Sequence, residues 1–410
     1  MQKFLPGALM ALLALVACGG GGGATPPPLG NPGVTPTPAP TGTPGANPSS
    51  TPTPAATTAP RPSATPTVAP TMAPPTPTPT PLPTGPMVYS IDPSLFGSNA
   101  DIASFSVAAN GNVAPTRRIA GANTGLTVNG DGMTLGLAAN PATHQLFTMM
   151  GNQLLTFAAN ETGNTAPTSI ASLTNGASSP AGTLPAGFTY SGGPIAFDPT
   201  SGNLYIAAAI INTSANTATF EIDVIPANSS GSVTPTHVIT SSMFTAIRGI
   251  AVDGSGNLYV SNDGNTSNVL MFANAATLNG SAMPTAVIGA TTLITPAGLA
   301  IDSQGRVFVA DAPNNAVVVF GNMSAGFPLV GMIGGATSTV LGQPAGVALD
   351  ATGGIWVSDA SGSSTGNGNG VPVLFRFSLS TAIGQSSPTP TNAIAGLMTT
   401  LANPRCLQVF

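Results

Sequence analysis

Short runs of aliphatic, β-branched and aromatic residues recur along the chain after residue 86, and polar, glycine-rich turns separate them. None of these runs continues with the 3.6-residue spacing of an amphipathic helix. Runs of this length between turn-forming residues are typical of short strands. The pattern therefore predicts an all-β domain.

The runs belong to a longer repeat. Four segments align well, for example Gly249-Ile-Ala-Val-Asp253-Gly-Ser-Gly-Asn-Leu-Tyr-Val, and a fifth copy is weaker. The marker residues Asn140, Asp198, Asp253, Asp302 and Asp350 follow one another at intervals of 58, 55, 49 and 48 residues. Periods of this size with strand-like runs favour four-stranded blades around a central channel.

The repeats resemble those of NHL-type six-bladed β-propellers, and the resemblance covers nearly all of residues 87–410. It implies a six-bladed β-propeller with four-stranded blades. Within each repeat the first strand is short and apolar, as an inner strand crowded around a channel requires. A proline precedes the predicted outer strand in most repeats, which suits an edge that must not recruit further strands. These prolines are Pro115, Pro167, Pro235, Pro284 and Pro328.

The two ends of this region complete one blade. The last residues, 403–410, supply only an inner strand, while residues 87–92, 103–107 and 116–120 align with the second, third and fourth strands of the other repeats. We therefore expect the C-terminal strand to pair with the N-terminal strands of the same blade. Such closure needs no disulfide, and Cys406 is expected to be a small buried residue.

The N-terminus predicts targeting to the cell envelope. Residues 1–17 have one positive charge and then an apolar run, as in a signal peptide. Leu15-Val16-Ala17-Cys18 resembles the lipobox of bacterial lipoproteins, which implies cleavage before Cys18 and acylation of its thiol. Gly19, where a retention aspartate would stand, implies the outer membrane. The alternative is an unpaired cysteine in an ordinary signal peptide.

Residues 18–86 link this anchor to the repeats. After Cys18 and a glycine run they consist largely of Thr-Pro and Ala-Pro repeats, with Arg61 the only charge. Proline lacks an amide donor, and no apolar periodicity exists to pack, so this segment is predicted to be a disordered stalk.

Composition removes several classes of function. Only 5% of the residues are charged, and the 13 acidic residues outnumber the 8 basic ones, which excludes nucleic-acid binding through a basic patch. Two cysteines exclude a disulfide framework and a four-cysteine zinc site. A monomeric propeller that binds a protein, peptide or glycan fits these limits.

Candidate ligand residues fall where the second strand of each repeat ends, because propeller loops form the channel mouth there. The aligned residues are Asp92, Met150, Ala208, Asn262, Asp311 and Asp359, with Asp263 adjacent. Four of the six aligned positions offer oxygen ligands, which Ca²⁺ prefers. Alternatively, each side chain caps the amides of its own loop. The marker aspartates Asp198, Asp253, Asp302 and Asp350 are expected to be structural residues of hairpin turns.

An enzyme is the second possibility, because calcium-dependent lactonases and a peptide-amidating lyase share the fold that the resemblance implies. The lactonases use a metal-binding Glu with Asn and Asp, whereas the only glutamates here are Glu161 and Glu221. The lyase would require zinc-binding histidines, and this chain has only His144 and His237, in different regions of their repeats. The sequence thus favours a binding or scaffold module without a cofactor. A divalent-metal-dependent hydrolase or lyase remains the alternative.

Overall fold

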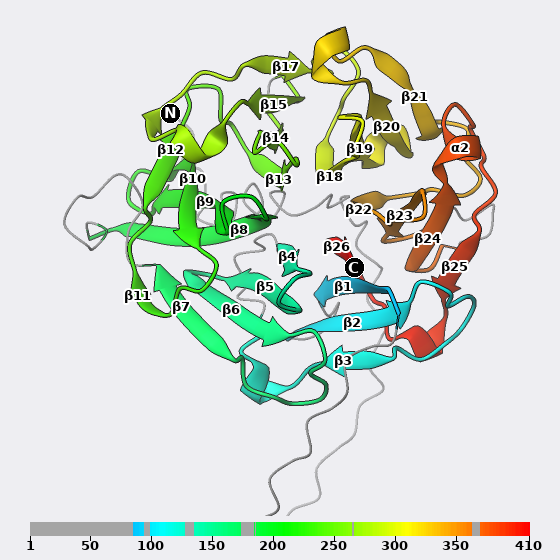
Figure 1. Cartoon of the computed structure of the whole chain (residues 1–410), viewed down its shortest axis with the longest axis horizontal. Coiled ribbons are helices and arrows are strands. Elements are labelled where there is room, and N and C mark those ends of the chain that lie inside the picture. The colour runs from blue at the N-terminus through cyan, green and yellow to red at the C-terminus, as the bar shows by residue number, and fades with distance from the viewer. Residues whose placement is uncertain are drawn as a thin grey trace, which may run out of the picture. The chain divides into compact units, whose positions relative to one another are not determined.

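The computed structural model describes residues 85–93, 99–127, 135–173, 184, 186–264, 266–362 and 370–410. The predicted signal peptide, Cys18 and almost all of the predicted stalk lie outside these residues. The described chain is all-β and forms six sheets arranged as a six-bladed β-propeller (Figure 1). This confirms the predicted fold.

Each blade has four antiparallel strands, and we number the blades in chain order. Blade 1 contains β4 (Leu137–Asn140), β5 (Gln145–Met150), β6 (Gln153–Ala158) and β7 (Ser169–Leu173). Blade 2 contains β8 (Phe188–Asp198), β9 (Asn203–Asn212), β10 (Thr217–Pro226) and β12 (His237–Thr240). Blade 3 contains β13 (Ile247–Val252), β14 (Leu258–Asn262), β15 (Asn268–Phe272) and β17 (Ala286–Ile288).

The remaining blades follow the same order from the channel outward. Blade 4 contains β18 (Pro296–Ile301), β19 (Val307–Asp311), β20 (Ala316–Phe320) and β21 (Leu329–Gly334). Blade 5 contains β22 (Pro344–Leu349), β23 (Gly354–Asp359), β24 (Val373–Ser378) and β25 (Asn392–Ala395). Blade 6 contains β26 (Leu407–Val409), β1 (Met87–Pro93), β2 (Ala100–Ser106) and β3 (Arg117–Ile119).

Helical segments are short and lie in the connections. They are η2 (Ala122–Thr124), η3 (Ala275–Thr277), η4 (Ala312–Asn314), η5 (Met323–Ala325), α2 (Leu379–Ala382) and η6 (Leu397–Thr399).

Blade 6 closes the ring as the sequence predicts. The C-terminal strand β26 is the inner strand of that blade and pairs antiparallel with β1, with Ser90 opposite Leu407. The amide of Met87 donates to the carbonyl of Phe410 at 2.9 Å, and the rings of Tyr89 and Phe410 stack at 4.8 Å between centroids. The first and last described strands therefore stabilise one another.

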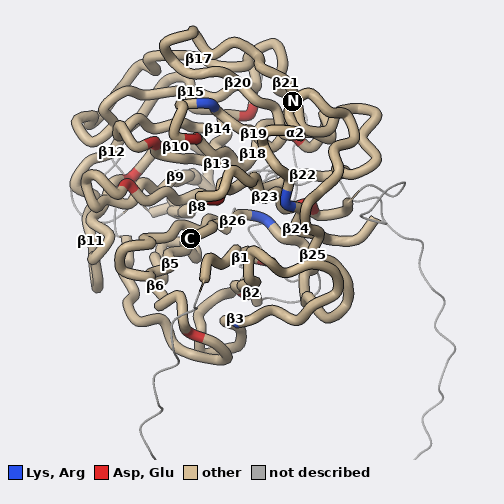
Figure 2. Tube along the Cα trace, turned by 45° about the vertical axis from the view of Figure 1, so that its right-hand side comes forward, with Lys and Arg blue, Asp and Glu red and all other residues tan. Residues whose placement is uncertain are grey.

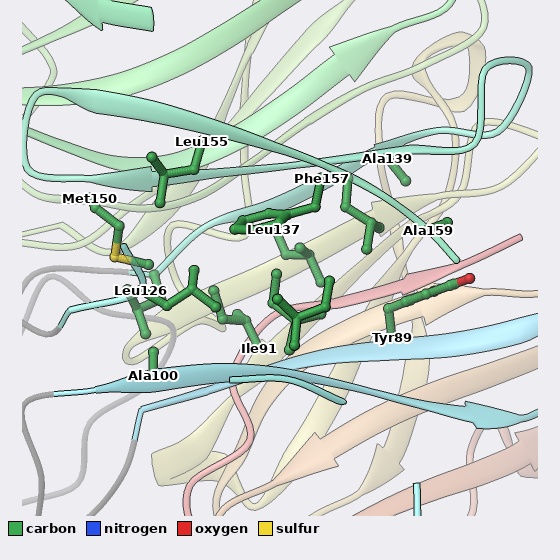
Figure 3. Packing of buried hydrophobic residues seen from close by; sticks show 14 of the residues in the cluster. Tyr89, Ile91, Ala100, Leu126, Leu137, Ala139, Met150, Leu155, Phe157 and Ala159 are labelled. Carbon is green, nitrogen blue, oxygen red and sulfur yellow. The ribbon is translucent and has the colours of Figure 1, made fainter. Parts of the chain in front are cut away.

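Neighbouring blades pack through apolar side chains. Between blades 6 and 1, residues of β1 such as Ile91 meet residues of β4 to β6 such as Leu137 and Phe157 (Figure 3). Between blades 5 and 6, Trp356 is fully buried against Val88 and Leu407, as a packing residue. Repeated apolar faces of this kind form the core, since each blade alone cannot bury its own faces.

The marker aspartates close the hairpin between the first and second strands. In blade 4, Oδ1 of Asp302 accepts the amides of Gln304 and Arg306 at 2.9 Å, and Asp253 and Asp350 accept the equivalent amides. In blade 5 the guanidinium of Arg376 also binds Asp350. Although burial acts in the opposite direction, hydrogen bonds from Arg376 and Thr352 hold the pKa of Asp350 below its ordinary value.

Two expectations need correction. Ala208 does not end its strand, because β9 continues to Asn212 and forms a longer hairpin with β10. Cys406 is only partly buried and lies just before β26, packed against the cluster between blades 6 and 1. Sequence alignment placed Ala208 correctly in register, but the extra residues of this hairpin have no counterpart in the other repeats.

Candidate binding site at the channel mouth

The second strand of each blade ends beside the loop that enters the inner strand of the same blade. In blade 4, Asp311 at the end of β19 is fully buried and accepts two consecutive amides. Its Oδ2 accepts the amide of Ile294 at 2.8 Å, and its Oδ1 accepts the amide of Thr295 at 3.0 Å. The side chain amide of Asn314 also donates to Oδ2 at 2.8 Å. Asp311 thus fixes the entry loop of its own blade.

Blade 5 repeats this arrangement. Oδ2 of Asp359 accepts the amide of Gly342 at 2.8 Å, and Oδ1 accepts the amide of Gln343 at 2.9 Å. The amides of Ser361 and Gly362 add two further hydrogen bonds to Oδ1. Burial raises the pKa of Asp359, and the four amides act in the opposite direction. A carboxylate with this many donors is already coordinated by the backbone.

In blade 6 the same contact joins the two ends of the propeller. Asp92 in β1 accepts the amide of Ala402 at 2.7 Å and that of Asn403 at 2.8 Å. The side chain is buried, and burial raises the pKa of Asp92 to about 7 despite these two hydrogen bonds. The carboxyl group that takes up a proton near neutral pH is therefore also the group that holds the closing loop.

Blade 3 carries an asparagine at this position and a different loop geometry. Oδ1 of Asn262 accepts the amide of Thr245 at 2.8 Å, while Nδ2 donates to the carbonyl of Met243 at 3.0 Å. An asparagine suits this position because its partners are one backbone amide and one backbone carbonyl, whereas the aspartates accept two amides. The adjacent Asp263 pairs with the buried Arg248, whose NH2 lies 2.6 Å from Oδ2. A buried ion pair of this kind holds both groups in place.

The structure does not bring the candidate oxygen ligands together. Asp92, Asn262, Asp311 and Asp359 each turn into the entry loop of their own blade, and Asp263 turns toward Arg248. Met150 and Ala208 supply no polar group in the other two blades. Among the described residues, no group of three or more His, Cys, Asp or Glu side chains could hold a metal ion.

Aliphatic side chains border the channel, and polar atoms also face it, among them those of Gln408. Near the mouth, a cavity of about 50 Å³ is lined by residues in the first half of the inner strands, among them Gly249, Gly298 and Gly346. Beyond it, a cavity of about 220 Å³ is lined by the middle and end of the same strands. Ile195, Ile250, Leu299, Val347 and Leu407 border both cavities. The volume near the mouth has room for only a few water molecules.

Glycines make this narrow channel possible. A Cβ atom on Gly298 would lie 2.7 Å from the carbonyl oxygen of Ala345 and 2.8 Å from the Cα atom of Gly346. The inner strands therefore approach one another backbone to backbone. Ser358 supports this layer, because its hydroxyl accepts the amide of Gly346 and donates to the carbonyl of Arg405. We did not predict this packing role of the glycines from the sequence, although a glycine begins most of the aligned segments.

The remaining candidate catalytic residues lie apart. His144 is in the first hairpin turn of blade 1, and His237 is the first residue of β12 in blade 2. Glu161 lies in the connection after β6, and Glu221 is buried in β10. Charged residues are sparse along the trace as a whole (Figure 2). No pair among these four residues forms a described hydrogen bond.

Comparison with protein families identifies one of the repeats. The model of the NHL repeat matches residues 293–320, which run from the entry loop of blade 4 to the end of β20. This match supports the NHL-like character of the propeller. A search of the curated proteins gave no match.

Several solved structures also resemble this chain, at low sequence identity. A protein of unknown function from Bacteroides caccae has 12% identity and a TM-score of 0.49, covering 80% of this chain and 99% of that chain. A nidogen/laminin complex has 13% identity, a TM-score of 0.43 and coverages of 79% and 98%. A structure described as "a putative 6-phosphogluconolactonase" from Bacteroides uniformis has 11% identity, a TM-score of 0.46 and coverages of 79% and 85%. Likenesses at this level carry no argument about ligand or activity.

Proposed function

We propose that this chain is a lipoprotein of the bacterial outer membrane that presents its propeller as a binding or scaffold module for a protein, peptide or glycan. The anchor would be Cys18 with its acyl chains, and residues 19–86 would hold the propeller away from the bilayer. Among the described residues, no helix is long and apolar enough to span a membrane. Stable attachment would then depend on the lipid, because each buried CH₂ of an acyl chain adds about 0.8 kcal/mol.

One observation carries the choice of a binding module. Asp92, Asp311 and Asp359 use both carboxylate oxygens to fix entry loops. Rigid loops on a propeller make a preorganised surface, and preorganisation lowers the entropic cost of binding. The residues that remain exposed at this face include Ile294, with 51% of its surface accessible, which suits contact with a partner rather than proton transfer.

The test compares a substitution at the mouth with one on the opposite face. Ile294→Glu changes an exposed side chain but leaves its amide to Asp311. Ser303→Glu changes an exposed turn residue on the opposite face and serves as the control. With the full mature chain, we expect Ile294→Glu alone to weaken binding at least about tenfold, or about 1.4 kcal/mol. The probes are purified peptidoglycan and a library of extended peptides.

The alternative, a divalent-metal-dependent hydrolase or lyase, is tested separately. Calorimetric titration of the mature chain with Ca²⁺ should give no saturable heat if the carboxylates serve only as loop caps. A saturable signal that disappears in a variant with Asp92, Asp311 and Asp359 changed to Asn would favour the enzyme. Equal binding of the probes by both mouth and opposite-face variants would contradict the binding site proposed here.

A further inference from the structure

The outer edges of the blades show a second repeated device, which lies away from the channel mouth. After their third strands, five of the six blades send an extended segment alongside the outer strand of the preceding blade. We call the contact between one outer strand and this segment a seam. The segment pairs in parallel with β7 through β11 (Gly231–Val233) and with β12 through β16 (Gly280–Ser281). Single parallel bridges close three more seams, at Gly111, Gly163 and Gln385.

The hydrogen bonds of a closed seam are regular. The amide of Gly163 donates to the carbonyl of Arg118 at 2.7 Å, and the amide of Ala120 donates to the carbonyl of Gly163 at 3.1 Å. Gly111 makes the same pair of bonds with Ala393 and Ala395. A closed seam therefore satisfies the backbone groups that an edge strand otherwise leaves open.

The seam between blades 3 and 4 is the exception. Its outer strand β17 pairs only with β15 in the described chain. The segment of blade 4 that should cover it turns into η5 instead, and Oδ1 of Asn322 caps this turn by accepting the amide of Ala325 at 3.2 Å. Phe327 then adopts a left-handed conformation, with φ of 54°, and packs edge-on against Tyr259 of blade 3. Figure 1 shows η5 beside the end of β17, curled rather than extended.

Apolar side chains are exposed on the segments that border this seam. Val287 in the middle of β17 is 47% exposed, Met283 just before it is 72% exposed, and Met323 in η5 is 49% exposed. Leu329 and Val330, at the start of the outer strand of blade 4, are about half exposed. Residues 282–292 and 321–334 contain no charged residue, unlike β3, whose outer edge carries Arg117 and Arg118. An uncharged open edge with apolar side chains is a surface that another strand can extend.

We propose that the open seam binds an extended, uncharged segment of another protein, which adds as a strand parallel to β17. The five closed seams indicate the form of the occupant, because each is filled by a short extended segment of this chain. The absence of charge in residues 282–292 and 321–334 favours an uncharged segment, and Met283, Val287 and Met323 favour apolar side chains in it. Backbone hydrogen bonds would provide affinity and these side chains selectivity, as in other cases of strand addition.

Site-specific photo-crosslinking in the native envelope tests this proposal with the full chain. A photoreactive residue replaces Met283 at the open seam, and another replaces the exposed Ser232 at a closed seam as a control. We expect an adduct only from position 283, with the captured peptide identified by mass spectrometry as an uncharged segment of another protein. Val287→Lys should reduce this adduct at least tenfold, because it places a charge on the open edge.

A matched variant separates this effect from general destabilisation. Ile170 on β7 is 43% exposed and occupies the position equivalent to Val287, but its seam is closed. Ile170→Lys should leave the adduct from position 283 unchanged, and both lysine variants should melt close to the parent. The proposal is overturned by no adduct at 283, by an adduct retained in Val287→Lys, by a captured charged segment or lipid, or by capture of a second copy of this chain.

Discussion

The carboxylate of Asp92 accepts a hydrogen bond of 2.8 Å from the amide of Asn403, more than three hundred residues further along the chain. One contact thus has two roles, because it caps the entry loop of blade 6 and joins the two ends of the propeller. Asp311 and Asp359 make the equivalent contact within continuous stretches of chain. Only in blade 6 does loss of the contact also weaken ring closure.

The raised pKa of Asp92 predicts a pH dependence of stability. Its pKa is about 7 in the folded protein and near 3.8 when unfolded, so the folded state binds more protons between these values. The free energy of unfolding should therefore fall as pH rises from 5 to 8, by about 2 to 3 kcal/mol from this group. Chemical denaturation at both pH values measures the slope. Asp92→Asn should reduce it by most of this amount, and an unchanged slope would contradict the assignment.

A substitution at Asp311 tests the loop cap alone, because this residue has no part in ring closure. From the sequence we expect asparagine to accept the same amide hydrogen bonds at a cost of only about 0.5 to 2 kcal/mol, but the structure shows both oxygens accepting amides. An asparagine has one acceptor oxygen, so Asp311→Asn places an amide donor against a second donor. We expect a loss of about 1 to 3 kcal/mol in the free energy of unfolding. Asp302→Asn should cost less, because Oδ1 alone accepts the two turn amides and the ion pair of Oδ2 with Arg306 is partly exposed; equal losses would contradict this account.

The close approach of the inner strands makes a third prediction. A Cβ atom on Gly298 meets backbone atoms of blade 5, which cannot move aside as a side chain can. Gly298→Ala should therefore lower the free energy of unfolding by about 1 to 3 kcal/mol. Gly254→Ala is the control, because a Cβ atom there meets nothing within 4 Å. Similar melting temperatures for the two variants would refute a backbone-limited channel.

Anchorage is tested at the other end of the chain. If Cys18 is acylated, Cys18→Ser should abolish incorporation of labelled lipid and release the protein from the membrane fraction. The acyl chains supply the membrane affinity in this proposal, since one myristoyl-length chain alone binds only weakly. Absence of labelled lipid in the parent protein, with membrane fractionation the same in both, would contradict lipidation.

The repeats predicted the blades because each one carries its own local signals. The marker aspartate, the glycine of the inner strand and the apolar runs lie within a single blade, so a linear pattern encodes them. The two-amide cap of Asp359 was less visible, since its partners Gly342 and Gln343 lie 16 to 17 residues earlier in a loop of variable sequence. Aspartate at the end of a strand fits both a cap and a metal ligand, and only the loop geometry distinguishes them.

The seams were harder still to predict. Proline before the outer strand is consistent with a protected edge, but in five blades the protection itself comes from the next blade. Pro284 precedes β17 at the open seam just as Pro167 precedes β7 at a closed one, so proline alone does not distinguish them. The difference depends on whether the preceding residues extend, as around Gly280, or turn, as in η5.

Removal of residues 406–410 tests closure of the ring as a whole. This deletion removes β26, leaves the inner edge of β1 unpaired and takes away the ring of Phe410 that stacks on Tyr89. It also exposes apolar residues of two blade interfaces, including Leu407 and the side chains packed around it. We expect loss of a single cooperative unfolding transition, or aggregation, in thermal and chemical denaturation.

Phe410→Ala is the milder variant for comparison, because it keeps the backbone pairing and removes only the stacked ring. It should destabilise the propeller while preserving cooperativity, by about 1 to 3 kcal/mol for a partly buried aromatic side chain. A truncated protein that melts cooperatively within a degree or two of the parent would show that β26 does not hold the ring closed.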